Sequence, residues 1–275
     1  MDQQPPPHRA RKRFGQNFLQ DRTVIDRIIA AARLTPDTRV VEIGPGLGAL
    51  TEPLMEAAGH VDIFELDRDL ASRWREQQSG RLSVHEGDVL KLDWASVLTD
   101  PPYTLVSNLP YNISSQVLFR TLENRQLFQR LVLMFQKEVG DRICAGPGSR
   151  TYGILSVLCQ VWFDIRRVTI VRPGAFVPPP KVDSVVLAFE SLERPRVDIG
   201  DWSHFVRVVK AAFARRRKAL RGGLTAGGWS REQIEEALEA AGIDSGRRAE
   251  TLALDEFARL AEGLHPERLK AKQDK

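Results

Sequence analysis

The stretch Val40–Leu50, VVEIGPGLGAL, constrains the fold of this chain more than any other. Val40–Ile43 predicts a short buried strand, and a helix is expected from about Ala49. Three glycines at alternate positions, Gly44, Gly46 and Gly48, predict a tight turn that connects the strand to the helix. Glycine suits this turn because a Cβ would block both a positive φ and the close approach of a ligand to the backbone. A strand, a glycine-rich turn and a helix in this order are typical of the first unit of a parallel sheet.

Strand and helix patterns alternate after this stretch. The expected strands are 39–43, 60–65, 82–86, 103–107, 131–136, 165–171 and 184–189. The expected helices begin near Asp21 and Ala49 and then cover 69–77, 115–122, 138–144 and 154–162. This alternation predicts an α/β fold, with a parallel sheet covered on both faces and ligands at the carboxyl ends of its strands. The last two strands are close in sequence and predict an antiparallel addition at one edge.

The strand patterns stop at 193–195, where we place a domain boundary. Residues 1–192 are expected to form the α/β domain, and 1–10 within this range are expected to be a disordered Pro/Gln tail. Residues 193–275 show only helical patterns, such as the apolar stripe of Phe205, Val208 and Val209 and the capping box of Ser230 and Gln233. They predict a small all-helical domain.

Glu65 ends the second expected strand, so its carboxylate should lie beside the glycine turn. There it can accept hydrogen bonds from both hydroxyls of a ribose.

Two cofactors fit the glycine turn. Residues 44–49 satisfy the dinucleotide-binding pattern G-x-G-x-x-G/A, and the G-x-G-x-G spacing equally suits an S-adenosylmethionine (AdoMet) methyltransferase. Pro45 has no N–H and slightly disfavours a pyrophosphate cradle. The turn alone does not decide between the two cofactors.

The composition, 42% hydrophobic and 28% charged, is that of an ordinary soluble globular protein. No apolar run reaches membrane-spanning length, and the N-terminus lacks the apolar core of a signal peptide. Cys144 and Cys159 lie in apolar, helical surroundings without metal-ligand spacing, and we interpret both as reduced core residues. We therefore expect a cytoplasmic protein without membrane contact.

Basic residues are clustered in two segments. One is an N-terminal arm that contains Arg11, Lys12 and Arg13. The other, 207–221, holds seven basic residues and no acid, among them Arg217, Lys218 and Arg221. Such clusters suit a nucleic-acid backbone, although a solvated helix face would look the same.

The segment Asn108-Leu109-Pro110-Tyr111 follows the apolar strand 103–107. The Asn108 side-chain oxygen and the carbonyl of Leu109 or Pro110 can accept from the two N–H groups of an adenine amine. This favours a pyramidal nitrogen whose lone pair can attack a methyl group. Tyr111 can stack on the base, and the transfer requires alignment rather than a metal. An ordinary Asn-Pro turn is the alternative.

Two further residues could contact an adenine. Asp88, after the strand 82–86, can accept from the amine of a cofactor adenine or cap a turn. Phe176 lies in the Pro/Gly-rich segment RPGAFVPPPK, where an exposed ring could stack on a base, which contributes about 1–3 kcal/mol. Packing of the Phe176 ring onto the core is the alternative.

Several motifs occur in order along the chain: FGQNFL, VEIGPGLGALT, ELD, GDVL, NLPYNIS, FQKE and FVPPPKVDS. Together they resemble the small-subunit ribosomal RNA adenine dimethyltransferases, over about 11–264. The resemblance implies a Rossmann-like class I AdoMet-dependent methyltransferase domain, which produces S-adenosylhomocysteine, with a small helical C-terminal domain. It also implies dimethylation of two adjacent adenosines in the 3′-terminal hairpin of 16S rRNA, within an immature 30S subunit. We expect the free protein to be a monomer and to need no metal.

The resemblance also implies roles for individual residues. The cofactor contacts would be Asn17, Leu19, Gly44, Gly46, Glu65, Asp88 and Asn108. The catalytic loop would be Asn108 to Tyr111, with Phe176 as the second aromatic wall of the base pocket. The chain departs from the family at Gly222-Gly223, where an Asn is frequent, and this puts in doubt how rigidly the basic helix ends.

Three other functions remain as alternatives. One is a related methyltransferase that acts on large-subunit rRNA or on DNA adenine. Another is a non-catalytic assembly factor, although the intact segment 108–111 argues against that as the sole role. The third is an NAD-dependent oxidoreductase, for which no suitable His, Lys or Tyr set accompanies the turn.

Overall fold

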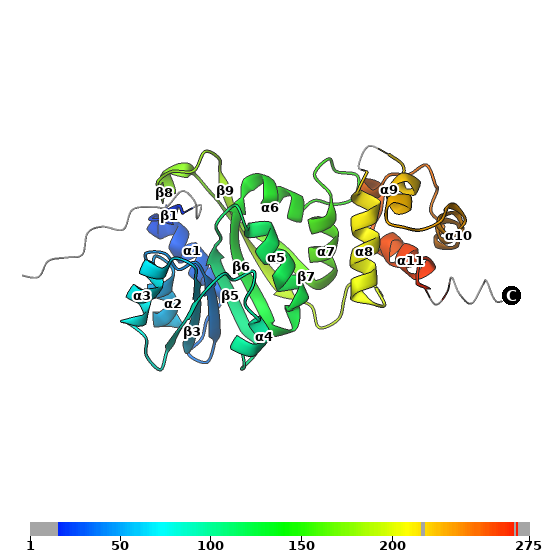
Figure 1. Ribbon diagram of the computed structural model, residues 1–275. Coiled ribbons are helices and arrows are strands. Elements are labelled where there is room, and N and C mark those ends of the chain that lie inside the picture. Colours follow the sequence, from blue (N-terminus) through cyan, green and yellow to red (C-terminus); the bar gives the residue numbers. More distant parts are fainter. Residues whose placement is uncertain (1–15, 216–217, 267, 269–275) are drawn as a thin grey trace, which may run out of the picture. The chain divides into compact units, whose positions relative to one another are not determined.

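The computed structural model describes residues 16–215, 218–266 and 268 (Figure 1). Within these residues the chain divides into two compact units. The first contains the described residues up to Gly140 together with Ile165–Ser191. The second contains Asp141–Asp164 and the described residues from Leu192 onward. This division differs from the sequence-based boundary at Asp141–Asp164, because aromatic contacts such as Tyr152 with Phe213 and Trp162 with Trp202 join that segment to the later helices.

Seven strands of the described chain form one sheet, in the order β4-β3-β2-β5-β6-β9-β7. Their bounds are β2 Arg39–Ile43, β3 His60–Glu65, β4 Leu82–Glu86, β5 Tyr103–Asn108, β6 Phe128–Gln136, β7 Phe163–Val171 and β9 Ser184–Ser191. The five strands from β4 to β6 are parallel, and β9 is antiparallel to β6. The predicted parallel sheet with an antiparallel addition at one edge is confirmed.

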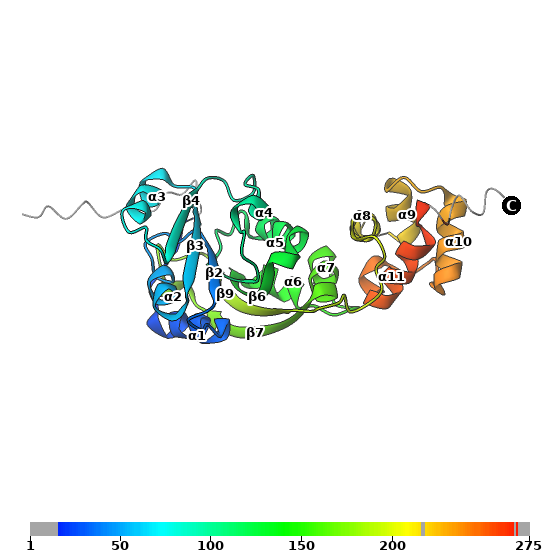
Figure 2. The same ribbon diagram turned by 90° about the horizontal axis from the view of Figure 1, so that it is seen from below.

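Helices cover both faces of this sheet, in layers visible in Figure 2. One core lies under α1 (Arg22–Ala32), α2 (Thr51–Ala57) and α3 (Arg68–Arg75). On the other face lie α4 (Trp94–Val97) and α5 (Ser114–Glu123), where the Trp94 ring stacks on Phe64 at 6.2 Å between centroids. A 3₁₀ turn, Arg125–Leu127, follows α5, and α6 (Lys137–Ile143) follows β6 directly.

A short antiparallel pair stands apart from the main sheet. In it, β1 (Phe18–Leu19) pairs with β8 (Phe176–Val177), with Leu19 opposite Phe176. The 3₁₀ turn Pro173–Ala175 precedes β8, and its Ala175 carbonyl accepts from the Gln20 amide at 2.8 Å. The sequence did not predict this pair, which brings Phe18–Leu19 against Phe176–Val177.

The second unit is helical in its described residues. Its elements are α7 Ile154–Trp162, α8 Trp202–Phe213, α9 Leu220–Ala226, α10 Arg231–Ala241, the 3₁₀ turn Ala249–Thr251 and α11 Leu254–Gly263. The Asp201 side chain caps α8, and the predicted stripe of Phe205, Val208 and Val209 is buried. The expected capping box of Ser230 and Gln233 is present at the start of α10.

Two sequence-based expectations about the second unit are wrong. The near-helical spacing of Arg207, Lys210, Arg217, Lys218 and Arg221 predicts a single helix over the basic segment 207–221. This prediction is wrong, because α8 ends at Phe213 and α9 begins only at Leu220. Cys144 is exposed, whereas Cys159 is buried as expected. None of the helices in the described ranges is long and apolar enough to cross a membrane.

Gly222 and Gly223 both lie inside α9, but only one of them is needed for packing. A Cβ on Gly223 would lie 2.4 Å from the carbonyl oxygen of Ala211 in α8, whereas a Cβ on Gly222 would make an ordinary 3.4 Å contact with Lys218. Gly223 therefore allows the backbone of α9 to approach α8 closely.

We expect Gly223→Ala to lower the free energy of unfolding by about 1–3 kcal/mol, because the added methyl group overpacks the contact between α8 and α9. Gly222→Ala is the matched control and should be neutral or stabilising by up to about 1 kcal/mol, because alanine favours a helix. Urea unfolding of both variants measures the difference. Equal stabilities would contradict the proposed close packing.

Candidate active site

The glycine turn between β2 and α2 is held by a tryptophan from α3. Gly44, Gly46 and Gly48 have φ values of +70°, +57° and +99°, which glycine adopts without strain. The Trp74 indole Nε1 donates to the Gly46 carbonyl at 3.1 Å. A Cβ on Gly48 would lie 2.7 Å from the same indole ring. The tryptophan therefore fixes the path of the turn.

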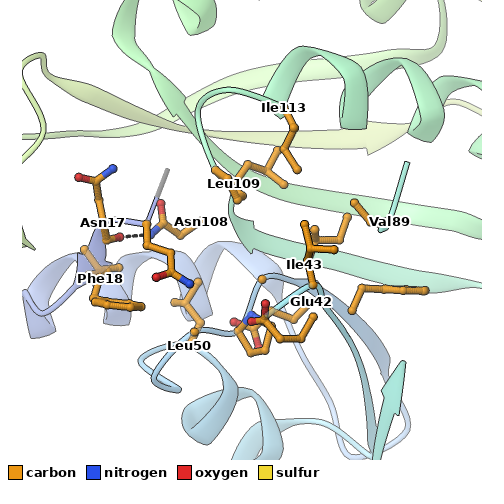
Figure 3. A pocket seen from close by; sticks show the side chains of 18 of the residues that line it. Asn17, Phe18, Glu42, Ile43, Leu50, Val89, Asn108, Leu109 and Ile113 are labelled. Carbon is orange, nitrogen blue, oxygen red and sulfur yellow. Dashed lines mark hydrogen bonds between the residues drawn. The ribbon is translucent and has the colours of Figure 1, made fainter. Parts of the chain in front are cut away.

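A pocket of about 1110 Å³, its open mouth included, lies at the carboxyl ends of the central strands. Its walls come from the segment before α1, the glycine turn and the ends of β3, β4 and β5 (Figure 3). The predicted residues that line it are Asn17, Leu19, Gly44, Gly46, Glu65, Asp88, Asn108, Leu109, Pro110 and Tyr111. The sheet thus brings together residues spread over almost 100 positions of the sequence.

Glu65 is 6% exposed at one end of this pocket. Burial raises the pKa of its carboxyl group, while hydrogen bonds from the backbone amides of Asp67 and Gly46 act in the opposite direction. The Asp67 amide donates to Oε1 at 2.8 Å. These amides fix the orientation of the carboxylate, which is what recognition of a ribose diol requires.

Glu42 is a second buried acid in the pocket wall, and sequence analysis gave it no role. The Thr51 hydroxyl donates to its Oε2 at 2.6 Å. Burial raises the pKa of Glu42 to about 8, the Thr51 bond lowers it, and the nearby Glu65 charge adds to the rise. This rise favours the neutral form of Glu42, which reduces the repulsion between Glu42 and Glu65. An acid in the middle of the apolar strand VVEI was the signal that could have revealed it.

Asp88 follows β4, and its carboxylate caps a turn, which is one of the two interpretations of this residue; contact with a cofactor adenine stays a prediction. Its Oδ1 accepts from the Leu90 amide at 3.0 Å, so it stabilises the turn, and it also lines the pocket. The turn hydrogen bond fixes the carboxylate at the pocket wall rather than excluding it from ligand binding.

Asn108 ends β5, and its side chain is oriented by the segment before α1. Its amide nitrogen Nδ2 donates to the backbone carbonyl of Asn17 at 3.1 Å (Figure 3). An amide group has donors on one side and an acceptor on the other. The bond to Asn17 therefore fixes where the acceptor Oδ1 points. Sequence analysis included Asn17 only through the family resemblance and did not foresee this contact.

Tyr111 lines the pocket, but Phe176 does not lie among the lining residues. The expected exposure of Phe176 is wrong: its ring is 2% exposed and belongs to the hydrophobic core under α1. Pairing of β8 with β1 turns this ring inward. A role of Phe176 in stacking on a base stays a prediction that the described conformation does not support.

The comparisons with known proteins agree with this geometry. The family profile "Ribosomal RNA adenine dimethylase" matches residues 7–265. The chain belongs to the ribosomal RNA adenine dimethylase family. It is 61% identical to the ribosomal RNA small subunit methyltransferase A of Syntrophotalea carbinolica, over 94% of this chain and 98% of that one. The protein of the same name from Geobacter sulfurreducens is 54% identical, over 93% of this chain and 95% of that one.

Solved structures of dimethylases and related methyltransferases share the fold. A dimethyladenosine transferase from Plasmodium falciparum is similar with a TM-score of 0.74 and 27% identity, over 88% of this chain and 95% of that one. The 23S rRNA methyltransferase ErmE is similar with a TM-score of 0.66 and 29% identity, over 90% of this chain and 99% of that one. The chain is thus an AdoMet-dependent rRNA adenine methyltransferase of the class I fold.

The predicted RNA-binding residues of this dimethylase are only partly described. Arg11, Lys12, Arg13 and Arg217 lie outside the described residues. Lys218 is exposed, and Arg221 in α9 forms an ion pair with Glu235 at 3.1 Å. Their role in RNA binding stays a prediction.

No group of three or more His, Cys, Asp or Glu side chains in the described ranges could hold a metal ion.

Replacing Phe176 distinguishes a core residue from a base-stacking residue. We expect Phe176→Ala to lower the free energy of unfolding by about 3–5 kcal/mol, because it leaves a cavity in the core. Val177, the 51% exposed neighbour, provides the control Val177→Ala, which should change stability by no more than about 0.5 kcal/mol. Urea unfolding checks both values. Unchanged stability of Phe176→Ala together with slower methyl transfer would instead support base stacking.

Proposed function

We propose that this protein transfers two methyl groups to the exocyclic amine of each of two adjacent adenosines in the 3′-terminal hairpin of 16S rRNA. The observation that carries the proposal is the oriented amide of Asn108 at the end of β5. Its Oδ1 can accept from one N–H of the target amine. A second acceptor must take the other N–H, so that the nitrogen lone pair is free to attack.

The structure favours Leu109 over Pro110 as that second acceptor. The Pro110 carbonyl already accepts from the Ile113 amide at 3.1 Å, which forms the turn into α5. Leu109 follows Asn108 directly in the chain and also lines the pocket, so its carbonyl is the remaining candidate. Asn108 and Leu109 therefore hold the amine, and Tyr111 supports the adenine ring. The proton lost from the amine after transfer can pass to water.

The pocket residues fit AdoMet. The fixed carboxylate of Glu65 suits its ribose diol, and Asp88 suits its adenine amine. Apolar side chains of the same pocket, such as Ile43, Phe64 and Val89, offer a surface for the adenine ring. AdoMet supplies, when bound, an electrophilic methyl group on a sulfonium. The chain's own residues hold and orient both reactants.

The small-subunit rRNA is the preferred substrate because the relatives that are 61% and 54% identical carry the name ribosomal RNA small subunit methyltransferase A. ErmE, a 23S rRNA methyltransferase, is 29% identical.

Measuring methyl incorporation into immature 30S subunits, 23S rRNA and duplex DNA distinguishes the three candidate substrates. We expect incorporation into the immature 30S subunit alone. Preferential incorporation into 23S rRNA would favour the ErmE-like alternative.

We further propose that the basic residues of the second unit bind rRNA, that the free protein is a monomer and that it acts in the cytoplasm.

Replacing Arg217, Lys218 and Arg221 with alanine should reduce the salt dependence of binding to the ribosomal subunit. The slope of log affinity against log salt concentration should fall by roughly 0.7–0.9 for each lost phosphate contact. AdoMet titration should not change. Unaltered binding at every salt concentration would indicate a merely solvated surface.

Glu65→Ala should weaken AdoMet binding by about 1.5–3 kcal/mol, because it removes a charged hydrogen-bond acceptor. Glu86→Ala is a matched control: Glu86 pairs in register with Glu65 at the end of β4 but bonds Arg75 at 2.7 Å and does not line the pocket. Isothermal titration calorimetry with AdoMet measures both variants. Equal affinities of the two variants would exclude Glu65 as the ribose contact.

Asn108→Ala should bind AdoMet within about tenfold of the wild type but transfer methyl groups at least about 100-fold more slowly, because its oxygen acts mainly in the transition state. Asn112→Ala provides the control, since Asn112 is an exposed asparagine that also lines the pocket. Single-turnover rates and AdoMet titration separate the two effects. A parallel loss of affinity and rate would assign Asn108 to cofactor binding only.

A further inference from the structure

The hydroxyl group of Tyr111 is held by a residue from a distant part of the sequence. Its Oη lies 2.5 Å from Oγ of Ser184, in a hydrogen bond between the segment NLPYNIS and the last residue of the segment FVPPPKVDS. Ser184 is fully buried, and Tyr111 is half-buried in the pocket wall. The bond therefore connects a pocket residue to the interior of the protein.

Ser184 is placed by the sheet rather than by a loop. It is the first residue of β9 and pairs in register with Gln136, the last residue of β6. The carbonyl of the preceding residue, Asp183, accepts from the Lys137 amide at 2.9 Å, which continues the contact between the two chain segments. The Ser184 hydroxyl thus has a fixed position beside the pocket residue Tyr111.

The backbone of Tyr111 is held as well. The Ser114 hydroxyl donates to the Tyr111 carbonyl at 3.2 Å, and the Ile113 amide donates to the Pro110 carbonyl at 3.1 Å. With the backbone and the tip of the side chain both fixed, little freedom remains for the two side-chain torsions. A ring that already has its binding orientation loses less entropy when a base stacks on it.

We propose that Ser184 is a positioning residue for methyl transfer, which acts by holding the Tyr111 ring in the orientation that stacks on the target adenine. The proposal rests on the function proposed above. Ser184 need not touch the substrate, because its effect passes through one hydrogen bond. A merely structural role would stabilise the fold through the same bond without changing the rate of transfer.

A double-mutant cycle tests this role. Ser184→Ala and Tyr111→Phe each remove one partner of the bond, and Tyr111→Phe keeps the aromatic ring. Each variant should slow single-turnover methylation of immature 30S subunits about three- to tenfold, the effect expected for one hydrogen bond. The double variant should be no slower than Tyr111→Phe alone, because Ser184 acts only through the Tyr111 hydroxyl.

Two controls distinguish positioning from general destabilisation. AdoMet affinity should stay unchanged in all three variants. Ser156→Ala removes another fully buried serine hydroxyl, one that bonds the Arg142 carbonyl away from the pocket, and should leave the rate unchanged. Urea unfolding of each variant measures any structural contribution separately.

Wild-type rates in either single variant, or effects that multiply in the double variant, would overturn the proposal. If Ser184→Ala does not fold, Tyr111→Phe still tests whether the hydrogen bond contributes to methyl transfer. A wild-type rate in Tyr111→Phe would exclude such a contribution. Failure of the proposed function would look different, since the wild-type protein itself would then transfer no methyl group to small-subunit RNA.

Discussion

The hydrogen bond from Asn108 Nδ2 to the Asn17 carbonyl is the interaction on which the site depends. It joins the end of the central strand β5 to the segment before α1. That segment is itself held by pairing of β1 with β8 and by the bond from the Gln20 amide to Ala175. The nitrogen and the oxygen of the Asn108 amide lie on opposite sides of the group. The hydrogen bond made by the nitrogen therefore fixes the direction in which the oxygen can accept from a target amine.

The rest of the pocket is arranged by backbone groups of the same sheet. Parallel strands end at one edge, so Glu65, Asp88 and Asn108 meet there although they are far apart in the sequence. Backbone amides orient Glu65 and Asp88, while Trp74 holds the glycine turn. The raised pKa of the buried Glu42 favours its neutral form, which reduces the repulsion between Glu42 and Glu65. These fixed groups need no rearrangement before two reactants can be aligned, which is the main requirement of methyl transfer.

Much of this arrangement could be predicted from the sequence, because buried apolar strands and glycine turns have strong local patterns. The bounds of β2, β3 and β4 are those that were expected. The pair of β1 and β8 could not be predicted, since two-residue strands show no periodicity. This omission explains the error at Phe176: the Pro/Gly-rich segment suggested an exposed ring, but the pairing buries it. The basic segment 207–221 has helical spacing throughout, yet the chain leaves α8 at Phe213. Spacing alone does not reveal where a helix ends.

The most direct test of this account is to map methylated adenosines after the purified protein acts on immature 30S subunits that lack them. RNA mass spectrometry of the 16S rRNA, after incubation with AdoMet, measures both position and number of methyl groups. The account predicts dimethyladenosine at two adjacent positions of the 3′-terminal hairpin with the wild-type protein, and unmodified adenosines with Asn108→Ala. Methyl groups at other positions, or full dimethylation by Asn108→Ala, would contradict it.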